Sequence, residues 1–127
     1  MQQAVRWARG LGAILGLTGV IAGALGSHAL ENSLSPDQLD AFETAVRFQL
    51  FHALLLLILG LWLERRPDGL LRASVWLTVA GVLAFSGSIY LLTLTPLRPG
   101  LVTPLGGLLL MAAWACLIAA AFRPLKS

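Results

Sequence analysis

Charged residues are scarce in this chain of 127 residues, and their scarcity excludes an ordinary soluble domain. Only 12% of the side chains are charged, whereas soluble domains carry about 25%. No charged residue occurs in residues 10–30, 48–63, 73–97 or 99–122. A helix needs about 20 residues to cross a hydrocarbon core about 30 Å thick. The sequence therefore predicts an all-α membrane protein, a bundle of four transmembrane helices with antiparallel neighbours.

Cysteine, histidine and membrane-embedded acid are too few for a metal or redox centre. The single cysteine, Cys116, excludes an intramolecular disulfide, and we interpret it as a packing thiol. The two histidines, His28 and His52, differ by about 10 Å in expected height along their helices, so they do not face each other across one iron. No carboxylate or thiolate lies at ligand spacing beside either one. We expect no metal and no cofactor.

The uncharged runs predict one membrane domain over residues 1–127, with spans at about residues 11–30, 44–63, 73–95 and 103–122. Residues 31–43 form an outer loop that ends in the amphipathic start of a helix. Ser35, Pro36 and Gln38 there suit an N-cap, a first helical position and a capping box. The second run is about 24 Å long as a helix, which is shorter than the core, so we expect Arg47 to snorkel outward.

The basic residues separate the spans instead of forming a patch, which argues against a nucleic-acid partner. Seven of the nine fall on one side of the predicted membrane: Arg6, Arg9, Arg65, Arg66, Arg72, Arg123 and Lys126. Arg47 and Arg98 fall on the other side. Because lysine and arginine concentrate on the cytoplasmic side, we expect a multi-pass protein of the cell inner (plasma) membrane with both termini in the cytoplasm.

The first span also has features of a secretory signal peptide. Arg6 and Arg9 precede an apolar stretch, and Ala22-Gly23-Ala24 is typical of a cleavage site. The apolar run nevertheless continues unbroken to Leu30. A span that stays in the protein is therefore the preferred interpretation.

Glycine recurs along the first span at alternating steps of four and three residues, a period of 3.5 that forms one nearly straight stripe. Its members are Gly12, Gly16, Gly19, Gly23 and Gly26. Small residues let helix backbones approach closely in lipid, where the hydrophobic drive for association is weak. We interpret the stripe as a packing face inside the bundle, with a homodimer seam as the alternative.

Seven polar side chains are predicted to lie between the membrane midplane and its outer surface. They are His28, Gln49, His52, Ser86, Ser88, Tyr90 and Thr103. By helix rise, Gln49 and His52 match the level of the two serines, and His28 matches Tyr90 and Thr103. Unsatisfied polar groups cost several kcal/mol in lipid, so each needs a partner. The cluster is therefore a set of interhelical hydrogen bonds or a small polar cavity open to the outside.

Four ordered motifs resemble the signatures of the YgdD-like family of small bacterial inner-membrane proteins, domain-of-unknown-function family 423. They are residues 23–30 (GALGSHAL), 44–54 (TAVRFQLFHAL), 85–91 (FSGSIYL) and 103–107 (TPLGG). The resemblance covers nearly the whole chain and implies a four-span inner-membrane protein. It supplies no substrate, cofactor or catalytic residue, but it singles out the same polar positions.

The sequence favours a non-enzymatic accessory, interaction or structural protein whose partners are the lipid bilayer and a second copy or another membrane protein. The alternative is a carrier or sensor of a small solute or proton that uses the outer polar cluster. A proton-coupled cation exporter is disfavoured because the first span has no acid before Glu31. Ser86, Ser88 and His52 imitate a nucleophile and base, but no acid at their depth orients the histidine, so we expect no catalytic residues.

Overall fold

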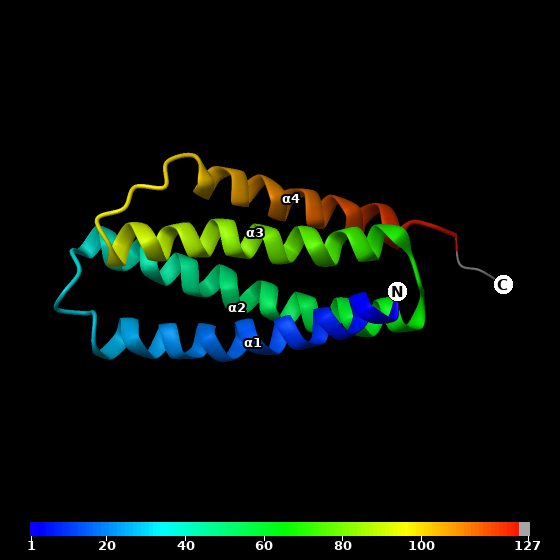
Figure 1. Cartoon of the computed structure of the whole chain (residues 1–127), viewed down its shortest axis with the longest axis horizontal. Coiled ribbons are helices and arrows are strands. Elements are labelled where there is room, and N and C mark those ends of the chain that lie inside the picture. Colours follow the sequence, from blue (N-terminus) through cyan, green and yellow to red (C-terminus); the bar gives the residue numbers. More distant parts are fainter. Residues whose placement is uncertain (125–127) are drawn as a thin grey trace.

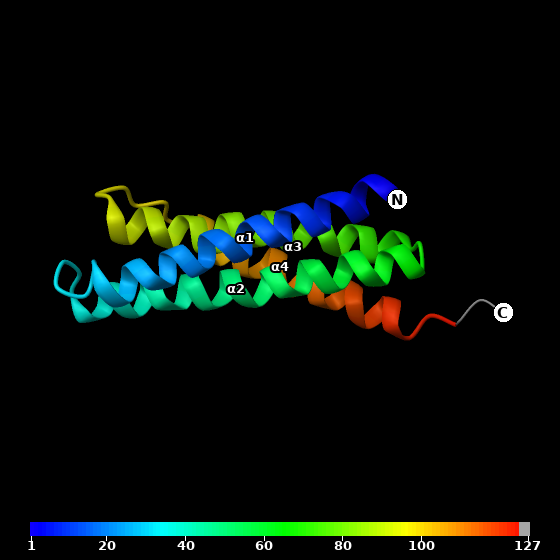
Figure 2. The ribbon, with the colours of Figure 1, turned by 90° about the horizontal axis from the view of Figure 1, so that it is seen from below.

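The computed structural model describes residues 1–124 as four long helices connected by short loops. The helices are α1 (Gln2–His28), α2 (Pro36–Arg65), α3 (Gly69–Leu94) and α4 (Val102–Ala121). Neighbouring helices in the chain run in opposite directions, so Met1 and the end of α4 lie at the same end of the molecule (Figures 1 and 2). We call this the termini end, and the other the loop end. Lys126, one of the seven basic residues assigned to one side, lies outside the described residues.

The chain marks the helix boundaries with local signals. Ser35 accepts a hydrogen bond from the backbone N–H of Gln38, whose side chain accepts in turn from the backbone N–H of Ser35. The predicted capping box is therefore confirmed. Asp68 caps α3 by accepting from the N–H of Leu70 at 2.7 Å. Gly100 turns the chain into α4 with φ +62°, a left-handed conformation that glycine adopts without strain.

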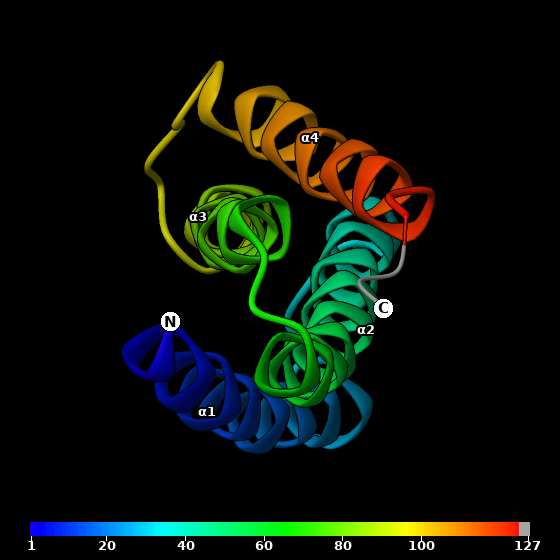
Figure 3. The ribbon, with the colours of Figure 1, turned by 90° about the vertical axis from the view of Figure 1, so that its right-hand side faces the viewer.

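The helices α2 and α3 occupy the middle of the array, and α1 and α4 lie on opposite sides of it. Viewed along the long axis, α1 packs on α2 and α4 packs on α3, while α1 touches α3 only lightly (Figure 3). The backbones of α2 and α4 stay apart, so only long side chains connect them. This separation leaves a groove between α2 and α4.

The apolar core is concentrated at the termini end. It consists of side chains from all four helices, among them the fully buried Leu56, Leu59, Leu71 and Val75. The predicted polar residues lie outside this cluster. Buried apolar side chains also occur nearer the loop end, where Phe42 and Ile89 lie, and buried polar side chains occur nearer the termini end, where Ser74 and Thr78 lie.

The outer surface of the helices is as apolar as the core. Leu17 on α1, Leu54 on α2 and Met111 on α4 are each more than 60% exposed, and similar residues surround the molecule. Soluble proteins rarely expose contiguous apolar areas of this extent. Each helix is also long and apolar enough to cross a membrane. Lipid chains are the environment that such a surface requires, and the protein is a four-span membrane protein.

The glycine stripe of α1 faces α2 along its whole length. A Cβ atom at Gly12 would lie 3.0 Å from the carbonyl oxygen of Ala53, and one at Gly26 would lie 3.0 Å from the ring of Phe42. At Gly19 it would lie 2.7 Å from Leu50 Cδ2. The stripe therefore packs against α2 inside the protein.

A still closer approach joins α3 to α4. A Cβ atom at Gly106 would overlap the backbone nitrogen of Phe85 and lie 2.8 Å from its Cα. On the opposite helix, a Cβ atom at Gly81 would lie 2.8 Å from Leu110 Cγ. These two glycines let the backbones of α3 and α4 meet, which compensates for the weak hydrophobic drive between helices in lipid.

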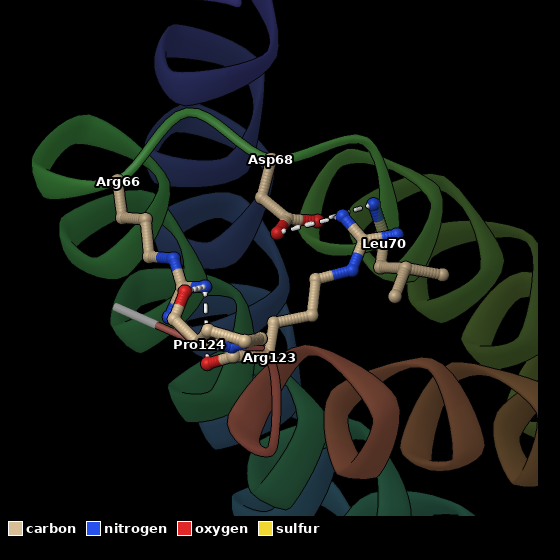
Figure 4. A network of polar contacts seen from close by, with 5 residues as sticks. All are labelled: Arg66, Asp68, Leu70, Arg123 and Pro124. Carbon is tan, nitrogen blue, oxygen red and sulfur yellow. Dashed lines mark hydrogen bonds and ion pairs between the residues drawn. The ribbon is translucent and has the colours of Figure 1, made fainter. Parts of the chain in front are cut away.

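A polar network closes the termini end (Figure 4). Arg123 forms an ion pair with the buried carboxylate of Asp68 at 3.0 Å, and Arg66 donates to the backbone oxygens of Arg123 and Pro124. Burial by itself raises the pKa of Asp68, but the Leu70 N–H and the Arg123 guanidinium outweigh it, so its pKa lies below its usual range. This contribution to stability is present above the ordinary carboxyl pKa and is lost as the pH falls through the lowered value.

We expect Gly106→Ala to destabilise the protein by about 1–3 kcal/mol, since the added methyl group meets backbone that has no rotamer to change. The matched control is Gly107→Ala, where the new Cβ atom meets only the Phe85 ring at 3.9 Å. There alanine is expected to be neutral or to stabilise the helix by up to about 1 kcal/mol. The measurement is unfolding in detergent, and equal stability of the two variants would contradict close packing at Gly106.

Candidate functional site

The seven predicted polar residues do not form one cluster. The structure distributes six of them over three helix interfaces and leaves His28 apart. We describe the three groups as the Gln49 group between α1, α2 and α3, the His52 group between α2 and α4, and the Ser88 group between α3 and α4. All three lie toward the loop end from the apolar core.

The Gln49 group joins three helices through one buried amide. The Gln49 Nε2 donates to the carbonyl oxygen of Leu15 at 2.9 Å and to Thr18 Oγ1 at 2.7 Å, both on α1. From α3, the Tyr90 hydroxyl donates to Gln49 Oε1 at 2.6 Å. Both ends of the amide therefore have partners, and α1, α2 and α3 are fixed relative to one another. Thr18 is not among the seven polar residues that the sequence singles out.

A cavity of about 230 Å³ adjoins this group on the side where α1 and α3 diverge. Thr18, Gln49, Ser86 and Tyr90 contribute its polar lining, and the rest of the lining is mostly aliphatic. Ser86 directs its hydroxyl to the carbonyl oxygen of Ala45 at 2.8 Å. The polar atoms around the cavity are therefore already hydrogen-bonded within the protein.

The His52 group uses both nitrogens of the imidazole. Nδ1 lies 2.7 Å from the carbonyl oxygen of Phe48, and the indole N–H of Trp114 donates to Nε2 at 3.2 Å. A carbonyl oxygen only accepts and an indole nitrogen only donates, so Nδ1 carries the proton and Nε2 does not. This geometry fits the neutral ring. It also corrects the expectation that His52 shares partners with Gln49 or the serines.

The Ser88 group connects the two outer segments of α3 and α4. Ser88 Oγ lies 2.5 Å from Thr103 Oγ1 and also donates to the carbonyl oxygen of Phe85 at 2.9 Å. The sequence predicts a span that begins at about residue 103; the helix begins at Val102 with Leu101 as its N-cap, so Thr103 lies within the helix. The threonine side chain is used for interhelical contact.

His28 occupies the last position of α1 and is exposed. Its expected level matched Tyr90 and Thr103, yet those residues bond to Gln49 and Ser88 instead. Within residues 1–124, no three His, Cys, Asp or Glu side chains gather as a metal site would require. The one buried side-chain polar atom without a hydrogen bond in that part of the chain is Thr78 Oγ1, which belongs to none of the three groups.

A groove of about 410 Å³ opens between α2 and α4 beside the His52 group. Its lining is Arg47, Phe48, Phe51, His52 and Trp114. The ring centroids of Phe51 and Trp114 are 6.3 Å apart, and those of His52 and Trp114 are 6.0 Å apart. Four aromatic rings and a guanidinium group thus surround one opening. The sequence did not predict this groove, because Trp114 comes from a distant segment of the chain.

The family model described as "Protein of unknown function (DUF423)" matches residues 22–107, about two thirds of the chain. The chain belongs to the DUF423 family. A UPF0382 membrane protein of Staphylococcus haemolyticus is 40% identical over 114 residues, which cover 89% of this chain and 93% of the relative.

Other relatives of this DUF423 protein are also UPF0382 membrane proteins. The UPF0382 membrane protein YwdK of Bacillus subtilis is 35% identical over 115 residues, 89% of this chain and 94% of the relative. A UPF0382 membrane protein of Staphylococcus aureus is 38% identical over 114 residues, 89% of this chain and 93% of the relative. No solved structure matches the chain. The family is one of membrane proteins whose biochemical role is unknown.

The matched segment contains all seven polar positions that the sequence predicted. It leaves out Thr18 and Trp114, the partners of Gln49 and His52 that the sequence analysis missed. The sequence holds no clear signal for Thr18, since it lies one residue from Gly19 and two from Gly16, spacings that do not share a helix face with the stripe.

Proposed function

We propose that this DUF423 protein is a non-enzymatic accessory or structural protein that acts through contacts of its outer helix faces with another membrane protein. The observation that supports this proposal is that the protein's main buried polar groups form hydrogen bonds with one another or with the backbone. Gln49 and His52, the two most chemically capable of them, each have partners for both of their polar atoms inside the protein. A catalytic or transport site would instead need donors or acceptors that remain available to a substrate.

The proposal includes a location and an orientation. The protein would lie in the inner (plasma) membrane with its termini end in the cytoplasm, in keeping with the excess of arginine at that end. The test is a set of alkaline phosphatase fusions. We expect a fusion within residues 32–35 to be active and one after Ser127 to be inactive, and the reverse result would contradict the orientation.

The outer faces of α1 and α4 are the surfaces available for such contacts, because α1 and α4 lie at opposite sides of the array. Leu17 on α1 is 65% exposed and Met111 on α4 is 67% exposed. A photoreactive amino acid placed at each of these positions in living cells tests the contact. We expect a discrete protein–protein adduct from at least one of the two faces.

The matched control is the same photoreactive residue at Leu54, which is 62% exposed on α2 and tests whether any lipid-facing position gives an adduct. Adducts with lipid alone at Leu17 and Met111 would contradict the proposal. An equal set of protein adducts at all three positions would also contradict it, because random collision in the membrane would then account for them.

A second candidate function, a carrier or sensor of a small solute, is favoured by the cavity beside the Gln49 group. Its volume of about 230 Å³ suits a small molecule, and the hydroxyl oxygens of Thr18, Ser86 and Tyr90 keep acceptor lone pairs for a donor on that molecule. Under this alternative, gently purified protein would retain one small molecule by mass spectrometry. Gln49→Leu would release that molecule while the protein stays folded.

A further inference from the structure

Arg47 lies deeper in the membrane than a surface residue does. The exposed ion pair between Arg9 and Glu64 marks the polar edge at the termini end, since the uncharged runs of α1 and α2 begin beside it. Arg47 is 17 residues from Glu64 along one continuous helix, which is about 26 Å even if α2 stands upright. A hydrocarbon core about 30 Å thick extends beyond that point. Arg47 therefore starts inside the apolar layer.

A basic residue at this place is not explained by topology. Arg47 is on the side of the membrane where lysine and arginine are rare, and charged groups inside the apolar layer are costly and usually functional. Over the part of the chain that the structure describes, it forms no ion pair, although Glu43 is one turn away on the same helix. Its guanidinium donates only to the hydroxyl of Thr44, at 3.2 Å.

The groove between α2 and α4 begins at this unpaired charge. Phe48, Phe51 and Trp114 make its walls apolar, and all three rings are at least 39% exposed to the lipid layer. Both ring nitrogens of His52, at the base of the groove, are already hydrogen-bonded to Phe48 and Trp114. Arg47 is therefore the polar group available to an incoming molecule. The groove thus combines a positive charge at one end with an apolar channel. An amphiphile with an anionic head and an apolar tail would complement both.

We propose that this groove binds one anionic phospholipid of the leaflet at the loop end. The lipid phosphate accepts charge-assisted hydrogen bonds from the Arg47 guanidinium, and one acyl chain lies along the rings of Phe48, Phe51 and Trp114. The planar guanidinium group suits two phosphate oxygens at once. The groove's volume of about 410 Å³ holds part of an acyl chain, so the remainder of the lipid stays in the bilayer. The assignment goes beyond the proposed protein contact and does not depend on it.

Native mass spectrometry of the delipidated full-length protein in detergent tests the assignment, with phosphatidylglycerol as the anionic probe and phosphatidylcholine as the zwitterionic one. We expect one phosphatidylglycerol to bind per chain in preference to phosphatidylcholine. Arg47→Gln should weaken its apparent affinity about tenfold or more, the effect of losing a charge-assisted contact. Arg47→Lys should retain part of the affinity, because it keeps the charge but not the fork of donors.

Arg98→Gln is the control that removes a positive charge away from the groove, and it should leave phosphatidylglycerol binding unchanged. Arg98 is the other basic residue at the loop end, but its side chain bonds to the backbone oxygens of Leu92 and Leu97 and does not line the groove. Phe51→Ala tests the apolar wall of the groove and should weaken lipid binding. Its control is Leu54→Ala, which should not, because Leu54 is as exposed (62%) as Phe51 (63%) but does not line the groove. Melting temperatures near that of the wild type show that each variant is folded.

Equal phosphatidylglycerol binding by Arg47→Gln and the wild type would overturn the proposal, as would equal binding of the two lipids. Complete displacement of phosphatidylglycerol by inorganic phosphate would assign the site to a free anion and overturn the lipid assignment. A dimer that forms without lipid and is abolished by Phe51→Ala would show that a second copy occupies the groove, which also contradicts the proposal.

Discussion

A polar group that is buried in a bilayer finds its partner inside the protein or has none, and the half of this molecule nearer the loop end is organised by that constraint. Water does not compete there, so a missing partner costs several kcal/mol. Gln49 satisfies the constraint most fully, since its amide nitrogen donates to α1 and its amide oxygen accepts from α3. This amide links α1 directly to α3, since the two helices otherwise touch only lightly and are connected mainly through α2.

Close backbone approach provides the second part of the fold, because apolar side chains gain little from leaving lipid for another helix. Glycine residues allow this close approach at two interfaces. One is between α1 and α2, and the other is where Gly81 and Gly106 bring α3 and α4 together. No such contact joins α2 to α4, whose backbones stay apart. The His52–Trp114 hydrogen bond crosses that gap, and the aromatic groove with Arg47 at its edge is the space that remains.

Features that depend on neighbouring residues in the chain could be predicted from the sequence. The four spans follow from charge spacing, the start of α2 from the capping box at Ser35, and the packing face of α1 from the glycine period. Relative level along the helix axes could also be predicted, since helix rise is constant. Direction around the helix axis was not, because it depends on how neighbouring helices are arranged. Gln49 and His52 lie one turn apart on α2 yet face different neighbours, so a shared level does not identify the partner of either residue.

The central claim is that the buried polar side chains hold the helices together, and a double-mutant cycle on Gln49 and Tyr90 tests it most directly. Gln49→Leu and Tyr90→Phe each leave the other residue's polar atom without its partner, whereas the double variant removes both. In detergent unfolding, we predict that both single variants are destabilised. The double variant should lose less than the sum of the two, by a coupling of about 0.6 kcal/mol and at most about 2 kcal/mol. Additive losses, or a Gln49→Leu protein as stable as the wild type, would contradict the account.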